Sequence, residues 1–171
     1  AHGNEPSHHM AYLYNYVNKP YKTINYVHKI CNEFYKNAPD GLIGNEDCGQ
    51  MSAWDVFSAM GFYPVCPGDN NYQIAAPYFN SIKINLENGK HFIIENNTSK
   101  NEKISSVEVN NKTLTNFVLN HSDIINGGSI KFNSNKITGT NNSYIKQPNF
   151  ISNSNTTHLF APIIISNDKV F

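Results

Sequence analysis

The sequence predicts an α+β fold in which a helical part comes first and a small antiparallel β-sandwich-like domain follows. Up to about residue 60, apolar residues recur three or four positions apart, as on one face of a helix. From about residue 81 to 132, apolar and polar residues alternate instead. We therefore expect helices over 1–66, a β domain over 67–133, and an Asn/Ser-rich linker with the start of a further β segment over 134–171.

Three helices are expected in the first part. The first runs from about Pro6 to Val17, because proline suits the first helical position and the following Asn18-Lys19-Pro20 breaks a helix. The second runs from about Tyr21 to Tyr35 and carries one apolar stripe. The third extends from Met51 to Met60 and is ended by Gly61.

Five short strands are expected in the second part, at intervals of roughly ten residues that are typical of a sheet or sandwich. They cover 81–85, 91–95, 107–109, 117–119 and 129–132. Asn88-Gly89 favours a hairpin turn between the first two strands, and Asn110-Asn111-Lys112 favours one between the next two.

The composition excludes some classes of protein. Lys+Arg and Asp+Glu both number 13, so no net charge attracts nucleic acid or a membrane surface, and the apolar runs are too short to span a bilayer. Three cysteines, Cys31, Cys48 and Cys66, lack the spacing of metal ligands and leave the compartment open. Asn-x-Ser/Thr patterns begin at Asn96, Asn97, Asn111, Asn120, Asn141 and Asn155; they suit a secreted glycoprotein, but chance yields several in so asparagine-rich a chain.

Two glycine-flanked loops, each leading into a helix, carry the candidate chemistry. One is Gly44–Gly49, with Asn45, Glu46 and Asp47, and the other is Gly3-Asn4-Glu5. Unpaired N–H groups and the dipole of a helix N-terminus favour negative charge, so these carboxylates suit a general base or an oxygen ligand for a hard cation. The plainer alternative is helix capping, for which Asn and Asp are ordinary choices.

The order of the helices places the two loops together. The first helix leaves the level of the Asn4–Glu5 loop, the second returns to it, and the third starts there. We therefore expect both loops at the same end of an array of antiparallel helices.

Other polar and aromatic residues near the loops have plainer interpretations. His8 and His9 face different sides of the first helix, so at most one points toward Glu5, and adjacent histidines lack the spacing of a zinc site. Gln50 and Trp54 lie one turn apart on the third helix, and Trp54 is expected in the core rather than as a platform for a sugar. Four histidines farther along the chain form no constellation: His28, His91, His121 and His158.

The stretches Gly3–Tyr14 and Gly44–Trp54, followed by Gly61-Phe62-Tyr63-Pro64-Val65, resemble the C-terminal part of the catalytic region of glycoside hydrolase family 92. The resemblance continues to about residue 133. It implies the last helices of an (α/α)6 toroid followed by a small β region, and the activity of a calcium-dependent, exo-acting α-mannosidase on mannose-containing glycans outside the cytoplasm.

The resemblance also implies roles for individual residues. Asp47 matches the base of an inverting mechanism, with Asn45 assisting where many relatives have Asp. Glu5 and Asn4 match the loop that helps hold Ca²⁺, and His9, His8 and Glu46 match the part that binds substrate. The family's general acid belongs to a motif upstream of residue 1, so we expect these 171 residues alone to release little or no mannose.

Two rival interpretations come from other classes. A non-catalytic carbohydrate-binding or structural β module with a helical cap would leave hydrolysis intact when Asp47 is replaced. A secreted scaffold with no sugar site would show no change in melting on addition of calcium.

Overall fold

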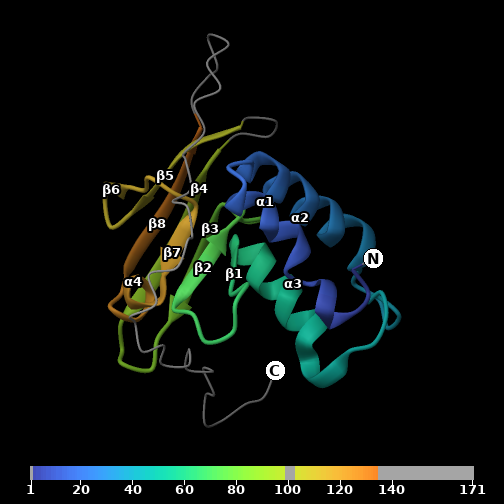
Figure 1. Cartoon of the computed structure of the whole chain (residues 1–171). Helices are drawn as coiled ribbons and strands as arrows, with labels where there is room; N and C mark the ends of the chain where they lie inside the picture. Colours follow the sequence, from blue (N-terminus) through green and yellow to red (C-terminus); the bar gives the residue numbers. More distant parts are fainter. Residues whose placement is uncertain (1, 99–102, 135–171) are drawn as a thin grey trace.

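A helical layer packs against a pair of β-sheets, which confirms the predicted α+β class. The computed structural model describes residues 2–98 and 103–134, so the predicted linker lies outside it apart from Ser134. Figure 1 shows the helices of the N-terminal part on one side, the larger sheet on the other, and a small sheet between them. The region 134–171 and the positions of the domain boundaries stay predictions.

The first helical segment is not the continuous helix that we predicted over Pro6–Val17. It consists of two 3₁₀ turns, η1 (Glu5–Ser7) and η2 (Met10–Tyr12), and a single α-helical turn, α1 (Leu13–Tyr16). In a regular helix the carbonyl of His8 would accept the Tyr12 N–H. Here that carbonyl accepts the indole N–H of Trp54 at 2.9 Å, and Tyr12 donates to His9 at 3.0 Å. The hydrogen bond from Trp54 of the third helix therefore replaces the backbone hydrogen bond that would continue the first helix as a regular α-helix.

The other two long helices match their predictions to within about a residue. Helix α2 spans Pro20–Phe34 and α3 spans Gln50–Met60, where Gly61 ends it with a left-handed φ of 95°. The side chains between these helices form one core, which includes Tyr12, Val27 and Trp54 with no exposed surface. Trp54 is thus a core residue, as the sequence predicts.

Two sheets make up the second part of the fold. The small sheet has the order β1-β2-β7, and the larger one has the order β3-β4-β8-β5-β6. The short helix α4 (His121–Ile125) joins β7 to β8. The strands are β1 (Phe62–Tyr63), β2 (Asn71–Ile74), β3 (Ser81–Asn85), β4 (His91–Asn97), β5 (Ile104–Val109), β6 (Lys112–Thr113), β7 (Val118–Asn120) and β8 (Gly128–Ser134).

Some strand pairings differ from the expected ones. Asn88-Gly89 does join β3 to its antiparallel neighbour β4, but the turn at Asn110-Asn111 leads into the short β6, and β7 belongs to the other sheet. Strand β8 enters between β4 and β5 and runs parallel to β4, because the chain crosses between the sheets through β7 and α4 before it returns. Strands β1, β2 and β6 were not predicted.

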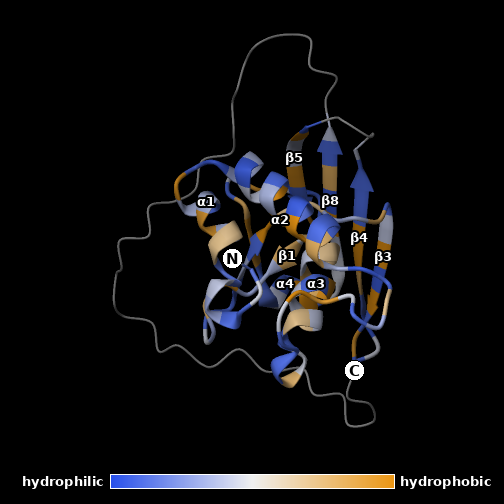
Figure 2. Cartoon of the chain, turned by 90° about the vertical axis from the view of Figure 1, so that its right-hand side faces the viewer, coloured by the Kyte–Doolittle hydropathy of each residue, from blue (hydrophilic) through white to orange (hydrophobic). Residues whose placement is uncertain are grey.

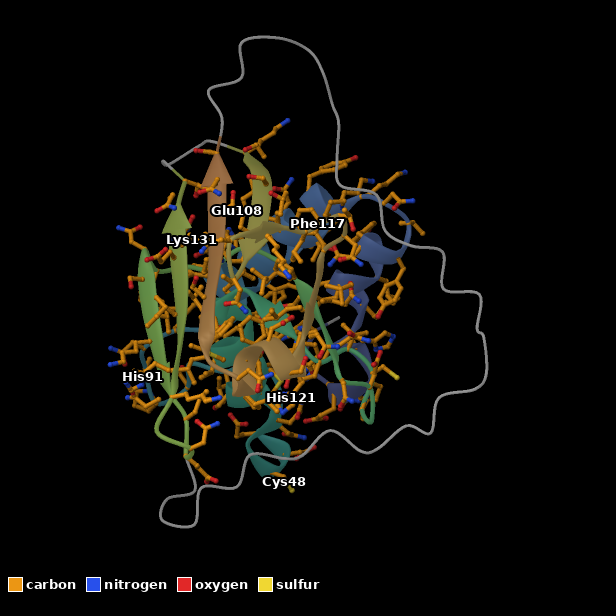
Figure 3. All side chains as sticks on the ribbon, turned by 90° about the vertical axis from the view of Figure 1, so that its left-hand side faces the viewer. Cys48, His91, Glu108, Phe117, His121 and Lys131 are labelled. Atoms are coloured by element: carbon orange, nitrogen blue, oxygen red, sulfur yellow. The ribbon has the colours of Figure 1, made fainter. Side chains whose placement is uncertain are left out.

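The two sheets enclose a core to which nearly every strand contributes. Its largest fully buried members are Phe62, Phe92, Phe132, Ile74, Ile94, Leu119 and Ile130. Apolar and polar residues alternate along β8, which Figure 2 shows by hydropathy. On the opposite, polar face Lys131 forms an ion pair with Glu95 at 3.1 Å, and Glu108 lies beside Lys131 in the strand register (Figure 3). Among the described residues, no helix has the length and apolar character that crossing a membrane requires.

Candidate active site

The two acidic loops lie against each other, as the order of the helices predicts. Gly44 has a φ of 84°, and a β-carbon added to it would overlap the carbonyl oxygen of Gly3. A β-carbon on Gly3 would in turn lie 3.4 Å from the carbonyl oxygen of Ile43. The backbones of the two loops are therefore in contact, and glycine at position 44 is what permits it.

The first loop presents Asn4 and Glu5 at the start of η1. The backbone carbonyl of Asn4 accepts hydrogen bonds from the N–H and hydroxyl of Ser7, at 3.0 and 2.7 Å, while its side chain makes no capping bond and is exposed. The Oε1 atom of Glu5 is buried and has no hydrogen-bond partner among the described residues. A buried carboxylate oxygen without a donor costs free energy, which a bound cation would offset.

The second loop presents Asn45, Glu46 and Asp47, which are all exposed. Asp47 begins a 3₁₀ turn (η3, Asp47–Gly49), in which Cys48 has a φ of 53° and Gly49 one of 77°. The left-handed conformation of Cys48 is uncommon for a residue with a side chain and is the kind of strain that accumulates at functional sites. Figure 3 shows Cys48 at the lower end of the molecule.

Glu46 caps helix α3. Its carboxylate accepts a hydrogen bond from the backbone N–H of Ser52 at 3.1 Å and another from the Ser52 hydroxyl. Partial desolvation acts against it, but these hydrogen bonds hold the pKa of Glu46 below its ordinary value. The capping alternative thus applies to Glu46, while the side chains of Asn45 and Asp47 make no hydrogen bond that the structure records.

The two adjacent histidines have different surroundings. His8 is 2% exposed, with its Nε2 atom 3.1 Å from the sulfur of Met51 and its Nδ1 atom 3.3 Å from the amide nitrogen of Gln50. Burial lowers the pKa of His8, against the opposing influence of the Glu5 and Glu46 charges. His9 is half-buried and its ring makes no recorded hydrogen bond, so of the two rings it is the one with a free polar edge.

His2 is a neighbour of the site that sequence reasoning missed. Its ring stacks on His8 at a centroid distance of 4.8 Å and lies 4.2 Å from the ring of Trp54, and its Nε2 atom is 2.7 Å from the Tyr35 hydroxyl. Burial, together with the charge of His8, lowers the pKa of His2 to about 4. The sequence signal that could have identified His2 is its position directly before Gly3, at the start of the first acidic loop.

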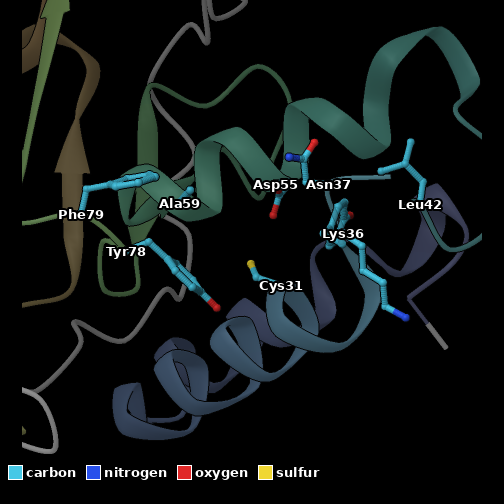
Figure 4. A pocket seen from close by; sticks show the side chains of 9 residues that line it. Cys31, Lys36, Asn37, Leu42, Asp55, Ala59, Tyr78 and Phe79 are labelled. Atoms are coloured by element: carbon cyan, nitrogen blue, oxygen red, sulfur yellow. The ribbon is translucent and has the colours of Figure 1, made fainter. Parts of the chain in front are cut away.

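Two hollows of the described surface have no residue of the two acidic loops in their lining. One, of about 560 Å³, opens next to His2 and Ser7 and is lined by apolar side chains of η2, α1 and α2. The other, of about 380 Å³, lies between α2 and α3, where the Cys31 thiol faces the Asp55 carboxylate (Figure 4). Burial raises the pKa of both groups, that of Cys31 to about 12, so the thiol is neutral and unreactive.

Part of a calcium site fits these residues. Glu5 supplies a buried oxygen without a donor, and Asn4 adds an amide oxygen, both of which are the hard ligands that Ca²⁺ prefers. Within residues 2–98 and 103–134, no three His, Cys, Asp or Glu side chains form a metal-binding group. Asn4 and Glu5 would therefore make up only part of the six to eight oxygen ligands that Ca²⁺ takes.

A family model described as the glycosyl hydrolase family 92 catalytic domain matches residues 1–136. The chain belongs to glycosyl hydrolase family 92. The resemblance drawn from the loop motifs is thereby confirmed, and the family 92 match covers the helices, both acidic loops and the sheets.

Solved and curated relatives agree with the family 92 assignment. The α-mannosidase BT3965 of Bacteroides thetaiotaomicron, solved with mannoimidazole, is 42% identical with a TM-score of 0.72, over 77% of this chain and 18% of that one. The inverting mannosidase BT2199 of the same organism is 37% identical with a TM-score of 0.72, over 80% of this chain and 19% of that one. An uncharacterized secreted glycosidase of Arthroderma benhamiae is 31% identical over 134 residues, which are 75% of this chain and 17% of the relative. The chain thus spans less than a fifth of the length of these relatives.

Proposed function

We propose that the complete protein that carries this chain is an inverting, calcium-dependent exo-α-mannosidase that removes terminal α-mannose, such as the α-1,2-linked mannose of N-glycans. The observation that carries the proposal is the contact of the Asn4–Glu5 loop with the Asp47 loop at the start of α3. Membership of family 92 and the likeness to two solved mannosidases support it. The likeness to a relative named a secreted glycosidase supports a site of action outside the cytoplasm.

Asp47 is the general base of the proposed reaction. Its exposed carboxylate removes a proton from water while the oxygen of that water attacks the anomeric carbon, and the bond to the departing oxygen breaks on the opposite face of the sugar. A carboxylic acid outside this chain protonates the departing oxygen. Asn45, two positions before Asp47 and equally exposed, orients the water.

The Asn4–Glu5 loop, which lies against the Asp47 loop, contributes to binding the sugar. Asn4 and Glu5 would contribute oxygen ligands to Ca²⁺, which would supply positive charge for binding sugar hydroxyls. His9, with its free ring edge, donates or accepts a hydrogen bond to the substrate. Glu46 supports the loop rather than contacting the sugar directly, because its carboxylate already caps α3.

The experiment compares the complete protein with its D47N variant, with D40N as a matched control in the neighbouring exposed loop. Loss of a general base lowers rates by about 10²- to 10⁴-fold, so D47N should lose at least about a hundredfold in kcat with little change in KM. NMR of the first product should show inverted mannose, and a chelator should abolish turnover. Full activity of D47N would instead favour a non-catalytic carbohydrate-binding or structural module.

A further inference from the structure

His8 attaches the Asn4–Glu5 loop to helix α3. Its ring contacts Gln50 and Met51, and its carbonyl accepts the Trp54 indole N–H at 2.9 Å. Within the described part of the chain, every recorded hydrogen bond between residues 3–9 and 44–54 ends on His8. The Glu5 and Asp47 loops are therefore joined by the packing of Gly3 on Gly44 and by this histidine.

The chemistry of the Gln50 amide fixes the state of the ring. An amide nitrogen only donates, and that of Gln50 has two acceptors, the Nδ1 atom of His8 at 3.3 Å and the Tyr63 hydroxyl at 2.9 Å. An accepting Nδ1 carries no proton, so the neutral ring carries its proton on Nε2. That N–H points at the Met51 sulfur, 3.1 Å away, which is a weak acceptor. Each nitrogen of the buried ring thus has a contact on α3, and the backbone of His2 also lies within hydrogen-bonding reach of the ring.

Gln50 and His8 stand at equal distances along the chain from the two proposed functional carboxylates. Gln50 follows Asp47 by three residues, and His8 follows Glu5 by three residues and donates its backbone N–H to the Glu5 carbonyl at 3.0 Å. A displacement of the ring is therefore passed on to Glu5 through one backbone hydrogen bond. Misplacement of catalytic groups by about 1 Å can cost about a hundredfold in rate.

We propose that Gln50 is a positioning residue, which holds the Asn4–Glu5 loop in register with Asp47 by donating a hydrogen bond to the ring of His8. This inference rests on the proposed function, because it assigns Gln50 a role in the same reaction. Gln50 itself touches neither substrate nor metal. Residues that orient metal ligands through hydrogen bonds offer a comparison. Their replacement typically costs about 10- to 100-fold in metal affinity or activity.

The test uses the complete protein and the Q50M variant, which keeps the length and bulk of the side chain but removes both donors. Q50M should lose about 10- to 100-fold in kcat and bind calcium about 10-fold more weakly, with KM changed less than about threefold. Calcium affinity, measured by calorimetry, is independent of turnover. The control Y63F removes the other acceptor of the amide and leaves the bond to His8, so kcat and calcium affinity should stay within about threefold of the wild-type values.

The outcomes separate this inference from the proposed function. Wild-type hydrolysis with unchanged kcat and calcium affinity in Q50M would overturn the positioning role and leave the mannosidase in place. Equal losses in Q50M and Y63F would also overturn it, because the bond to His8 would not be the decisive one. A wild-type protein that hydrolyses no α-mannoside would overturn both. Should Q50M not fold, Q50N serves, because its shorter amide does not reach the ring from the same backbone.

Discussion

Gly44 packs so closely on the carbonyl of Gly3 that no larger residue fits at position 44. We expect G44A to destabilise the protein twice over: alanine at a φ of 84° costs about 1 kcal/mol, and its methyl group must displace the backbone of Gly3. The total loss in the free energy of unfolding should be at least about 3 kcal/mol, measured by urea denaturation.

G49A is the matched control for G44A. Gly49 has a similar φ of 77°, but a β-carbon there meets nothing within 4 Å. G49A should therefore show the cost of the conformation alone, about 1 kcal/mol. Equal losses in the two variants would contradict a contact between the loops.

Glu46 stabilises helix α3 through the hydrogen bonds from Ser52. E46A should lower the free energy of unfolding by about 1 kcal/mol at neutral pH, as loss of a helix cap does, and E46Q, which keeps an acceptor oxygen, should lose less. Because the pKa of Glu46 lies below its ordinary value of 4.5, this stabilisation is present above that pH and is lost as the pH falls further. D40A, at an exposed position in the preceding loop, should leave stability unchanged; a loss as large as that of E46A would show that the cap is not the cause.

His121 should make the protein sensitive to mild acid. Its ring is 6% exposed, with Nδ1 2.8 Å from the Tyr72 hydroxyl, and burial lowers its pKa below the ordinary 6.5. As the pH falls below about 6.5, His121 becomes protonated in the unfolded chain but stays neutral in the folded one. The free energy of unfolding therefore decreases.

The measurement is the slope of stability between pH 7 and pH 5, which should be shallower in H121Q than in the wild type. H91Q replaces an exposed histidine at the start of β4 and should leave the slope unchanged (Figure 3). A slope that H121Q does not alter would place the acid sensitivity elsewhere.

The local elements could be predicted from the sequence wherever the chain's own pattern sets them. The apolar stripe of α2 and the Asn88-Gly89 hairpin depend on neighbours in sequence, and both formed as expected. The continuity of the first helix could not be predicted, because the indole of Trp54 takes the carbonyl that the helix would use. The parallel pairing of β4 with β8 likewise depends on residues far apart in the chain.

The candidate site divides in the same way. The sequence by itself determined which residue types stand in the two loops, that the loops meet, and the family to which the chain belongs. Only the tertiary structure decided how those residues are used. In the folded chain Glu46 caps α3, one oxygen of Glu5 is buried without a donor, and the nitrogens of His8 contact Gln50 and Met51 of α3. The physical reason is that the role of a carboxylate or an imidazole depends on the donors and acceptors around it. For His8 these belong to residues more than forty positions away in the sequence, and for Glu46 they belong to the first turn of α3.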